Sequence, residues 1–288
     1  MQKEKIKFAF FGTPQFAEIV LETLKQEGLL PRLIVTREDK PAGRHMVLTP
    51  PPVKVWAQKH NIPFIQPKSL KDPKLGFELR ASSFEFFVVA AYGKIIPKEV
   101  FTIPRRGTLN IHPSLLPELR GASPIEGAIL SENETGVTII EIDEEMDHGP
   151  IVIQKKVAVS EWPPYFEELE KLLAEESARL LARVLPDWIE GKIKLIPQNH
   201  SLATFTEKIS KEDGLIDLDD EPEKNLRKIR AFQHWPSAHF FIERKNKKIR
   251  IIVKAAELDS EGKLKITRLV PEGRKEISWE EFARGFLK

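Results

Sequence analysis

The chain has 288 residues, of which 41% are apolar and 31% charged, and its formal net charge is +2. This length favours one large domain with a smaller second one, and no apolar run approaches the roughly 18 residues that a membrane helix needs. The sequence has no cysteine, no zinc-type spacing among its seven histidines and no signal-peptide core, so we expect a cytoplasmic protein without disulfides, membrane association or a structural metal.

The first half of the chain alternates strand and helix patterns. The apolar run at residues 6–12 ends at a glycine, and residues 14–28 follow with helical spacing. Further strands are predicted at residues 31–38, 62–67, 84–92, 107–113 and 135–143, and further helices at 51–61, at 73–80 and from Pro124 onward. The alternation predicts an α/β fold, with an open, mostly parallel, Rossmann-like sheet whose ligands bind at the carboxyl ends of the strands.

The second half of the chain has a different pattern of apolar and charged residues. Residues 165–191 read as a long helix that packs on the sheet, and a connecting segment follows it. From Ala238 onward the chain shows short alternating segments joined by charged turns, which indicate a small antiparallel sheet or barrel. We therefore expect a catalytic domain at residues 1–203 and a β domain at residues 204–288.

Five cations fall within seven positions in "RKNKKIR", Arg244 to Arg250. Two interpretations are about equally supported by the sequence. The segment is either the solvated tip of a hairpin or a site that binds phosphate groups.

Asn110 and His112 stand out because they occupy alternate positions of one predicted strand, just before it breaks at Pro113. Alternate side chains share a face of a strand, so the amide and the imidazole point the same way. Four carboxylates, Asp143, Glu144, Glu145 and Asp147, crowd the loop after the next strand. An imidazole beside a carboxylate can act as an acid, and an amide can donate to a developing oxyanion. The set suits acyl transfer in which the substrate brings the nucleophile.

A purely structural interpretation of the same residues is that His112 caps a strand and Asn110 ties down a turn. The acidic loop is then a solvated turn. The segment "GTP" at residues 12–14 lacks the glycine pattern of a dinucleotide fold and the lysine of a phosphate loop, so both of those sites are excluded.

At this point the motifs themselves carry a resemblance. The segments "FAFFGTPQFA", "DKPAGR", "VVAAYGKIIP", "LNIHPSLLPELRGASPI", "TGVTIIEIDEEMDHG" and "EKISKEDGLIDL" occur in this order. Together they resemble the methionyl-tRNA formyltransferases, a branch of the folate-dependent formyltransferases, from about residue 6 to about residue 286. The resemblance implies transfer of the formyl group of 10-formyltetrahydrofolate to the α-amine of methionine on charged initiator tRNA.

The resemblance also implies roles for individual residues. Asn110 and His112 would stabilise the charged oxygen, and Asp147 would orient His112 and assist proton movement. Folate contacts are implied for Ser114, Leu115, Leu116, Pro117, Val89, Ala91, Tyr92, Gly93, Ile142 and Asp143. Substrate contacts are implied for Gly12, Thr13, Pro14 and Arg44, the last on a loop that enters the acceptor end of the tRNA.

Two departures from the family pattern concern tRNA binding. After Arg44 the chain has His45 and Met46 in place of a glycine and a basic stretch. The C-terminal part resembles the family's small OB-like barrel, but a strand pair is missing, so the domain is shortened. We expect it to expose a sheet edge.

Three alternatives remain beside this function. An amino-sugar nucleotide or purine-precursor formyltransferase would use the same folate and the same three residues. A catalytically silent RNA-binding protein would lack one of the three, and a hydrolase would pass the formyl group to water. The "DKPAGR" loop and the C-terminal segment favour the tRNA enzyme, and we expect it to be a monomer that needs no metal.

Overall fold

The computed structural model describes residues 6–43, 46–244 and 246–286. The described chain forms two compact units, each assembled from separate segments. The first holds the residues through Gly121, Thr135–Ala158 and Glu170–Phe205, and the second holds Ala122–Glu134, Val159–Leu169 and the residues from Thr206 onward.

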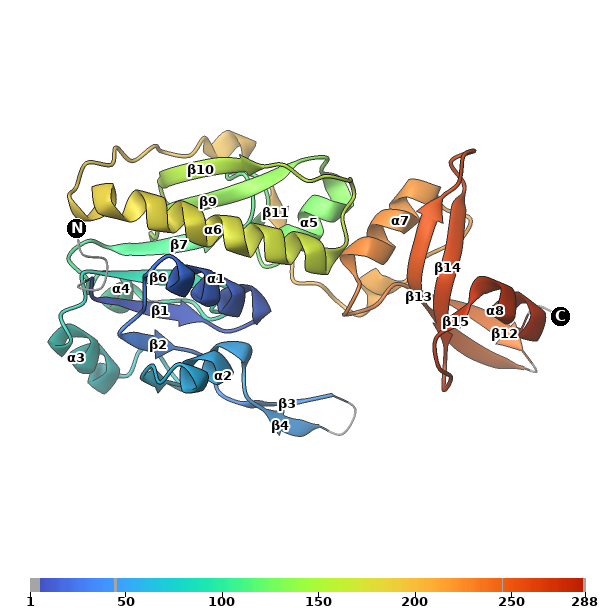
Figure 1. Ribbon diagram of the computed structural model, residues 1–288, viewed down its shortest axis with the longest axis horizontal. Coiled ribbons are helices and arrows are strands. Elements are labelled where there is room, and N and C mark those ends of the chain that lie inside the picture. Colours follow the sequence, from blue (N-terminus) through green and yellow to red (C-terminus); the bar gives the residue numbers. More distant parts are fainter. Residues whose placement is uncertain (1–5, 44–45, 245, 287–288) are drawn as a thin grey trace. The chain divides into compact units, whose positions relative to one another are not determined.

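A seven-stranded sheet forms the centre of the first unit, in the order β10-β9-β7-β6-β1-β2-β5 (Figure 1). Its strands are β1 (Phe8–Gly12), β2 (Leu33–Val35), β5 (Phe64–Ile65), β6 (Phe86–Ala90), β7 (Thr108–His112), β9 (Thr135–Glu141) and β10 (Ile151–Val157). The first five of these run parallel, whereas β9 is antiparallel to both of its neighbours. The mostly parallel sheet predicted from the sequence is thus confirmed.

Strand order shows where a ligand site belongs. The chain adds β2 and β5 on one side of β1, then returns to place β6 and β7 on the other side. Such a reversal opens a crevice at the carboxyl ends of the strands. All residues of β1 and β6 are buried, which explains their unbroken apolar sequence.

The remaining elements up to residue 214 precede, follow or connect these strands along the chain. The helices are α1 (Gln15–Gln26), α2 (Pro52–Lys59), α3 (Pro73–Ala81), α4 (Lys98–Phe101), α5 (Pro124–Ser131) and α6 (Phe166–Ile189). Short strands β3 (Lys40–Ala42) and β4 (Val47–Thr49) pair as a hairpin, and β8 (Arg120–Gly121) pairs with β11 (Phe205–Thr206). Two 3-10 turns, His200–Leu202 and Glu212–Gly214, complete the connections.

The second unit is built on a four-stranded antiparallel sheet, in the order β12-β13-β14-β15. The strands are β12 (His239–Arg244), β13 (Lys247–Leu258), β14 (Leu264–Pro271) and β15 (Ile277–Ser278). Helices α7 (Pro222–Ala231) and α8 (Trp279–Phe286) contribute Ile229 and Phe282 to the core of this unit. The predicted C-terminal β domain is confirmed. Because β15 pairs with β14 only at Arg268 and Leu269, the rest of that side of β14 is an open edge among the described residues.

Candidate active site

Strand β7 places Asn110 and His112 on one face of the large sheet, near its carboxyl end. Val89 of β6 is the partner of Asn110 in the parallel ladder and lies on the same face. His112 is buried, with 4% of its surface exposed, and Asn110 is half-buried. An amide and an imidazole therefore sit side by side where the strand leaves the sheet.

Asp147 reaches this face although β9 runs against β7. Its loop begins at the opposite end of the strand, since Glu141 pairs with Leu109, and it must fold back over the sheet. The Asn110 amide donates to Oδ1 of Asp147 at 3.1 Å, and the Gly121 backbone N–H donates to Oδ2 at 2.9 Å. Asp147 has φ +53°, a left-handed conformation that is uncommon outside glycine. The three residues that the sequence singled out are brought together.

Both ring nitrogens of His112 face oxygen acceptors. Nε2 lies 2.9 Å from the Leu119 carbonyl oxygen, and Nδ1 lies 3.5 Å from Oδ1 of Asp147. A neutral ring can donate to only one of these oxygens, whereas a ring protonated on both nitrogens donates to both. The Leu119 carbonyl and Asp147 therefore fix the orientation of the ring.

Gln198 and Arg120 stabilise the loop that carries Asp147. The sequence analysis assigned neither residue a role. The Gln198 amide donates to the carbonyl oxygens of Asp147 (2.9 Å) and Gly149 (2.7 Å). Its own oxygen accepts from Nε and Nη2 of Arg120, at 3.2 and 2.6 Å. Gln198 is 51 residues from Asp147 in sequence, and no local pattern marks it. Arg120 follows the Asn-x-His motif closely and could have been singled out from it.

Asp143 of the same loop is engaged with histidine. Its Oδ2 lies 2.6 Å from Nδ1 of His148, whose ring stacks on His200 at a centroid distance of 4.0 Å. Nδ1 of His200 lies 2.9 Å from Nη2 of Arg120. Asp143, which the resemblance implied as a folate contact, therefore also fixes the shape of the loop.

The turn after β7 is braced by hydrogen bonds to buried groups. The Ser114 hydroxyl donates to the Glu118 carbonyl oxygen at 2.7 Å, and the Thr138 hydroxyl donates to the Ser114 carbonyl oxygen at 2.7 Å. Gln154 donates to the Leu116 carbonyl oxygen, and the Leu116–Pro117 bond is cis. Leu115 is half-buried and lies against Gly136. The implied folate block thus begins directly beyond His112.

The ends of β1 and β6 lie at the same edge. Gly12 pairs with Ala90, and the Thr13 hydroxyl donates to the Tyr92 carbonyl oxygen at 2.8 Å. Pro14 caps α1, and Ala91 and Gly93 both have positive φ and are exposed. These residues follow β1 and β6, whose carboxyl ends adjoin that of β7.

Tyr92 is buried beneath this edge of the sheet. Only 2% of it is exposed, and its ring packs edge-on against Phe11. Its hydroxyl has no hydrogen-bond partner among the described residues. Burial raises the pKa of Tyr92 to about 12. The residue contributes chiefly to the core beneath the edge.

Two further predicted site residues remain, Ile142 and Arg44. Ile142 packs, half-buried, against a core cluster that contains Val89 and Tyr92. Arg44 lies outside the described residues, in the connection between β3 and β4. Within the described ranges, no group of three or more His, Cys, Asp or Glu side chains is arranged to hold a metal ion.

Comparison with known proteins assigns the chain to a family. Residues 4–185 match the model described as "Formyl transferase", and residues 208–263 match "Formyl transferase, C-terminal domain". The methionyl-tRNA formyltransferase of Chloroflexus aurantiacus is 45% identical over 260 residues, covering 89% of this chain and 82% of that protein. That of Halalkalibacterium halodurans is 36% identical over 301 aligned positions, covering 97% and 95%.

Solved structures agree at the level of the fold. The methionyl-tRNA formyltransferase of Clostridium thermocellum has a TM-score of 0.60 at 17% identity, covering 95% of this chain and 99% of that one. A sugar N-formyltransferase from Shewanella has a TM-score of 0.60 at 19% identity, covering 94% and 99%. The family resemblance carried by the motifs is confirmed, and the chain belongs to the formyl transferase family.

Proposed function

We propose that the protein transfers the formyl group of 10-formyltetrahydrofolate to the α-amine of methionine on charged initiator tRNA, and so serves translation initiation. The observation that carries the proposal is the Asn110–His112–Asp147 cluster at the carboxyl edge of the sheet. The two curated relatives described above, which are 45% and 36% identical to this chain over the aligned residues, are both methionyl-tRNA formyltransferases.

The cluster supplies what a direct formyl transfer requires. When the amine attacks the formyl carbon, negative charge gathers on the formyl oxygen, and a donor fixed beside that oxygen lowers the barrier. The Asn110 amide and the His112 ring are such donors, held on one strand. Asp147 contacts both through its Oδ1 atom, so it orients the ring and can assist the movement of a proton.

The folate site fits the same edge. When bound, 10-formyltetrahydrofolate supplies the activated formyl group. We assign its surroundings to the block from Ser114 to Pro117, to the end of β6 with the residues that follow it (Val89–Gly93), and to Ile142 and Asp143. The donors of the cluster match a carbonyl oxygen, and exposed backbone at Ala91 and Gly93 offers polar groups to a planar ring. No metal is needed for these roles.

Substrate contacts and domain roles complete the proposal. We assign Gly12, Thr13, Pro14 and Arg44 to the side of the acceptor, residues 1–203 to catalysis and residues 204–288 to tRNA contact. We also propose that the protein is a monomer and works in the cytoplasm. No helix in the described part of the chain is long and apolar enough to span a membrane.

The alternatives are less well supported. One sugar N-formyltransferase shares the fold at 19% identity, whereas the two curated tRNA enzymes are 36% and 45% identical over most of this chain. A silent RNA-binding protein has no need for an aspartate in a left-handed conformation that keeps an amide and an imidazole in register.

The first test is formyl transfer by the purified protein to methionine-charged initiator tRNA, with uncharged tRNA and an amino-sugar nucleotide as parallel acceptors. We expect transfer to charged tRNA alone. His112→Ala should lower the rate of the chemical step by roughly two or more powers of ten while folate binding persists. Near-normal turnover of this variant would exclude the proposed mechanism, and release of formate without an acceptor would indicate a hydrolase.

A further inference from the structure

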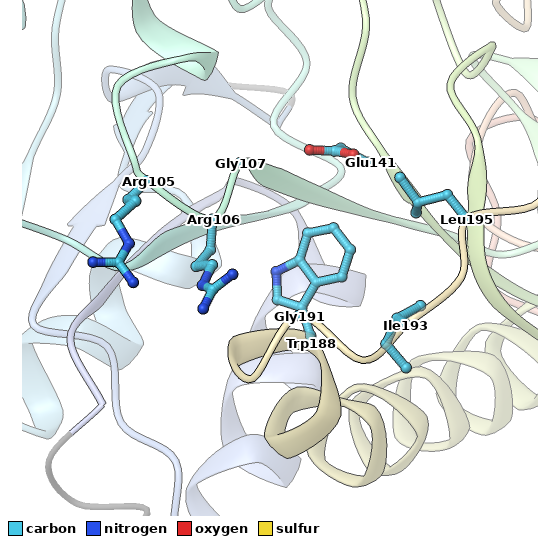
Figure 2. Close-up of a pocket in the computed structure, with 8 residues that line it drawn as sticks. All are labelled: Arg105, Arg106, Gly107, Glu141, Trp188, Gly191, Ile193 and Leu195. Atoms are coloured by element: carbon cyan, nitrogen blue, oxygen red, sulfur yellow. The ribbon is translucent and has the colours of Figure 1, made fainter.

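A cavity lies at the opposite end of β7 from the candidate active site. Its volume is about 210 Å³, and Figure 2 shows the residues that line it. They are Arg105, Arg106, Gly107, Glu141, Trp188, Gly191, Ile193 and Leu195.

This cavity faces away from the site described above. Glu141 pairs with Leu109 in the antiparallel ladder, so their side chains share a face. Asn110, the next residue of β7, points to the other face. A ligand here would be separated from Asn110 and His112 by the sheet itself.

Charges of both signs line the cavity without neutralising one another. In the described part of the chain, neither Arg105 nor Arg106 forms an ion pair with Glu141 within 4.0 Å. Figure 2 shows the guanidinium of Arg106 and the carboxylate of Glu141 on separate sides of the space. Burial raises the pKa of Glu141, as it does for a carboxyl that lacks a compensating partner. The arrangement holds one cationic pole and one anionic pole apart.

Trp188 adds an unused donor to an apolar wall. Only 8% of the residue is exposed, and its Nε1 has no hydrogen-bond partner among the described residues. Buried N–H groups of this kind are nearly always paired, so an unpaired one that lines a cavity points to a missing acceptor. The half-buried side chains of Ile193 and Leu195 continue the apolar wall.

We propose that this cavity binds a small zwitterion with an apolar body, the chemistry of a free apolar α-amino acid. Its carboxylate would lie against Arg106 and the Trp188 N–H, with Arg105 adding positive charge at the entrance. Its ammonium would lie against Glu141, and its side chain would cover Trp188, Ile193 and Leu195. Amino acids such as leucine are of the size that the cavity holds.

The test is calorimetric titration of the full-length protein with three ligands of one shape. L-Leucine carries both charges, 4-methylpentanoate lacks the ammonium, and 3-methylbutylamine lacks the carboxylate. We expect leucine to bind with a Kd of roughly millimolar order, and each analogue about tenfold or more weakly. Absence of saturable leucine binding at about 50 mM, or equal binding of all three ligands, would overturn the proposal.

Substitutions of charged residues test whether leucine binds in this cavity. Glu141→Gln should weaken leucine about tenfold and leave 4-methylpentanoate unchanged, while Arg106→Gln should weaken both. Unchanged binding of 4-methylpentanoate also shows that the Glu141→Gln variant is folded. Glu190→Gln and Arg183→Gln change exposed charges outside the lining and should alter neither ligand. Equal effects of the cavity and control variants would place the binding elsewhere.

Discussion

Gln198 is the residue on which the position of Asp147 depends most directly. Its amide group donates to two carbonyl oxygens of the loop, and its oxygen accepts from Arg120. It contacts Asp147 only at the backbone carbonyl and does not contact the carboxylate, so we regard it as a positioning residue. Its two functions can be separated because glutamate can accept from Arg120 but cannot donate to the loop.

We therefore expect Gln198→Glu to lower kcat by about ten- to a hundredfold while the KM for tRNA changes little. The ion pair with Arg120 should keep the thermal unfolding midpoint close to that of the parent. Asn199→Asp changes a neighbouring exposed amide in the same way and serves as the control. A parallel loss of kcat and folded protein would mean that Gln198 acts only through stability.

Glu126 of α5 links the stability of the protein to pH. Burial raises the pKa of its carboxyl above the ordinary value. A raised folded-state pKa means that the folded state binds the proton more tightly than the unfolded state. Its stabilising contribution is present below the ordinary pKa and is lost as pH rises through the raised value.

Glu126→Gln should therefore be more stable than the parent at pH 7, and the difference should shrink toward pH 4. The measurement is the free energy of unfolding from urea titrations at several pH values. Glu132→Gln, at the half-buried C-cap of the same helix, removes a carboxylate of the same kind and serves as the control. A difference that stays constant over the range would show that Glu126 titrates normally.

At the scale of elements, the end of the loop between β9 and β10 packs closely against Glu141, the last residue of β9. A Cβ built on Gly149 would lie 1.9 Å from the Glu141 carbonyl oxygen, which no real side chain tolerates. Glu141 also donates its backbone N–H to the Pro150 carbonyl oxygen at 3.0 Å. The two ends of the loop are thus closed against each other, which limits where Asp147 can lie.

Gly149→Ala should force this closure open and cost about 2 kcal/mol of stability, together with a larger loss of activity. Hydrogen exchange should show faster exchange at the loop. Gly76→Ala is the matched control, because a Cβ there meets only the end of the Arg80 side chain within α3, where alanine is the better helix former. Equal stability of the two variants would contradict the role of Gly149.

The sequence predicted the elements that carry clear apolar patterns. The strands at β1, β6, β7 and β9 and the helices α1, α2, α3, α5 and α6 all lie where periodicity placed them. Strand β10 was missed because its exposed edge carries Gln154, Lys155 and Lys156, which interrupt the apolar pattern. Helix α7 was missed because only one face is apolar and charges dominate the rest.

The site was predictable only as far as local patterns extend. Asn110 and His112 share a strand face, which alternation reveals at once. The choice of Asp147 among four carboxylates came from the family resemblance, since no spacing rule selects it. Gln198 could not be found at all, because its partners come together only in the folded chain.

At the scale of the whole molecule, the second unit is not a simple C-terminal segment. It includes α5, and Arg227 of α7 donates to the carbonyl oxygens of Ile129 and Glu132 at 3.0 and 2.6 Å. The boundary at residues 203 and 204 was drawn from the sequence alone and stays a prediction. Any contribution of the second unit to tRNA binding is best tested in the full-length chain.

The hairpin that joins β12 and β13 is the place for that test. Lys247 and Lys248 are exposed beside its turn, and the Lys248 ammonium lies 4.4 Å from the centre of the Phe241 ring. The opposite end of β13 has a second hairpin, in which Lys263 and Lys265 are paired with Glu261 and Glu257 at 2.7 and 2.8 Å. Unpaired lysines release counterions when they contact phosphate, whereas paired ones already have an anionic neighbour.

Changing Lys247 and Lys248 to Gln should flatten the dependence of log Kd for tRNA on log salt by about one to two units. Changing Lys263 and Lys265, at the start of β14, to Gln removes the same charge from the same sheet and should leave the slope nearly unaltered. The measurement is filter binding or anisotropy at several salt concentrations. Equal slopes for both variants and the parent would mean that the β12–β13 tip is a solvated hairpin, and that phosphate contacts must come from other surfaces of the molecule.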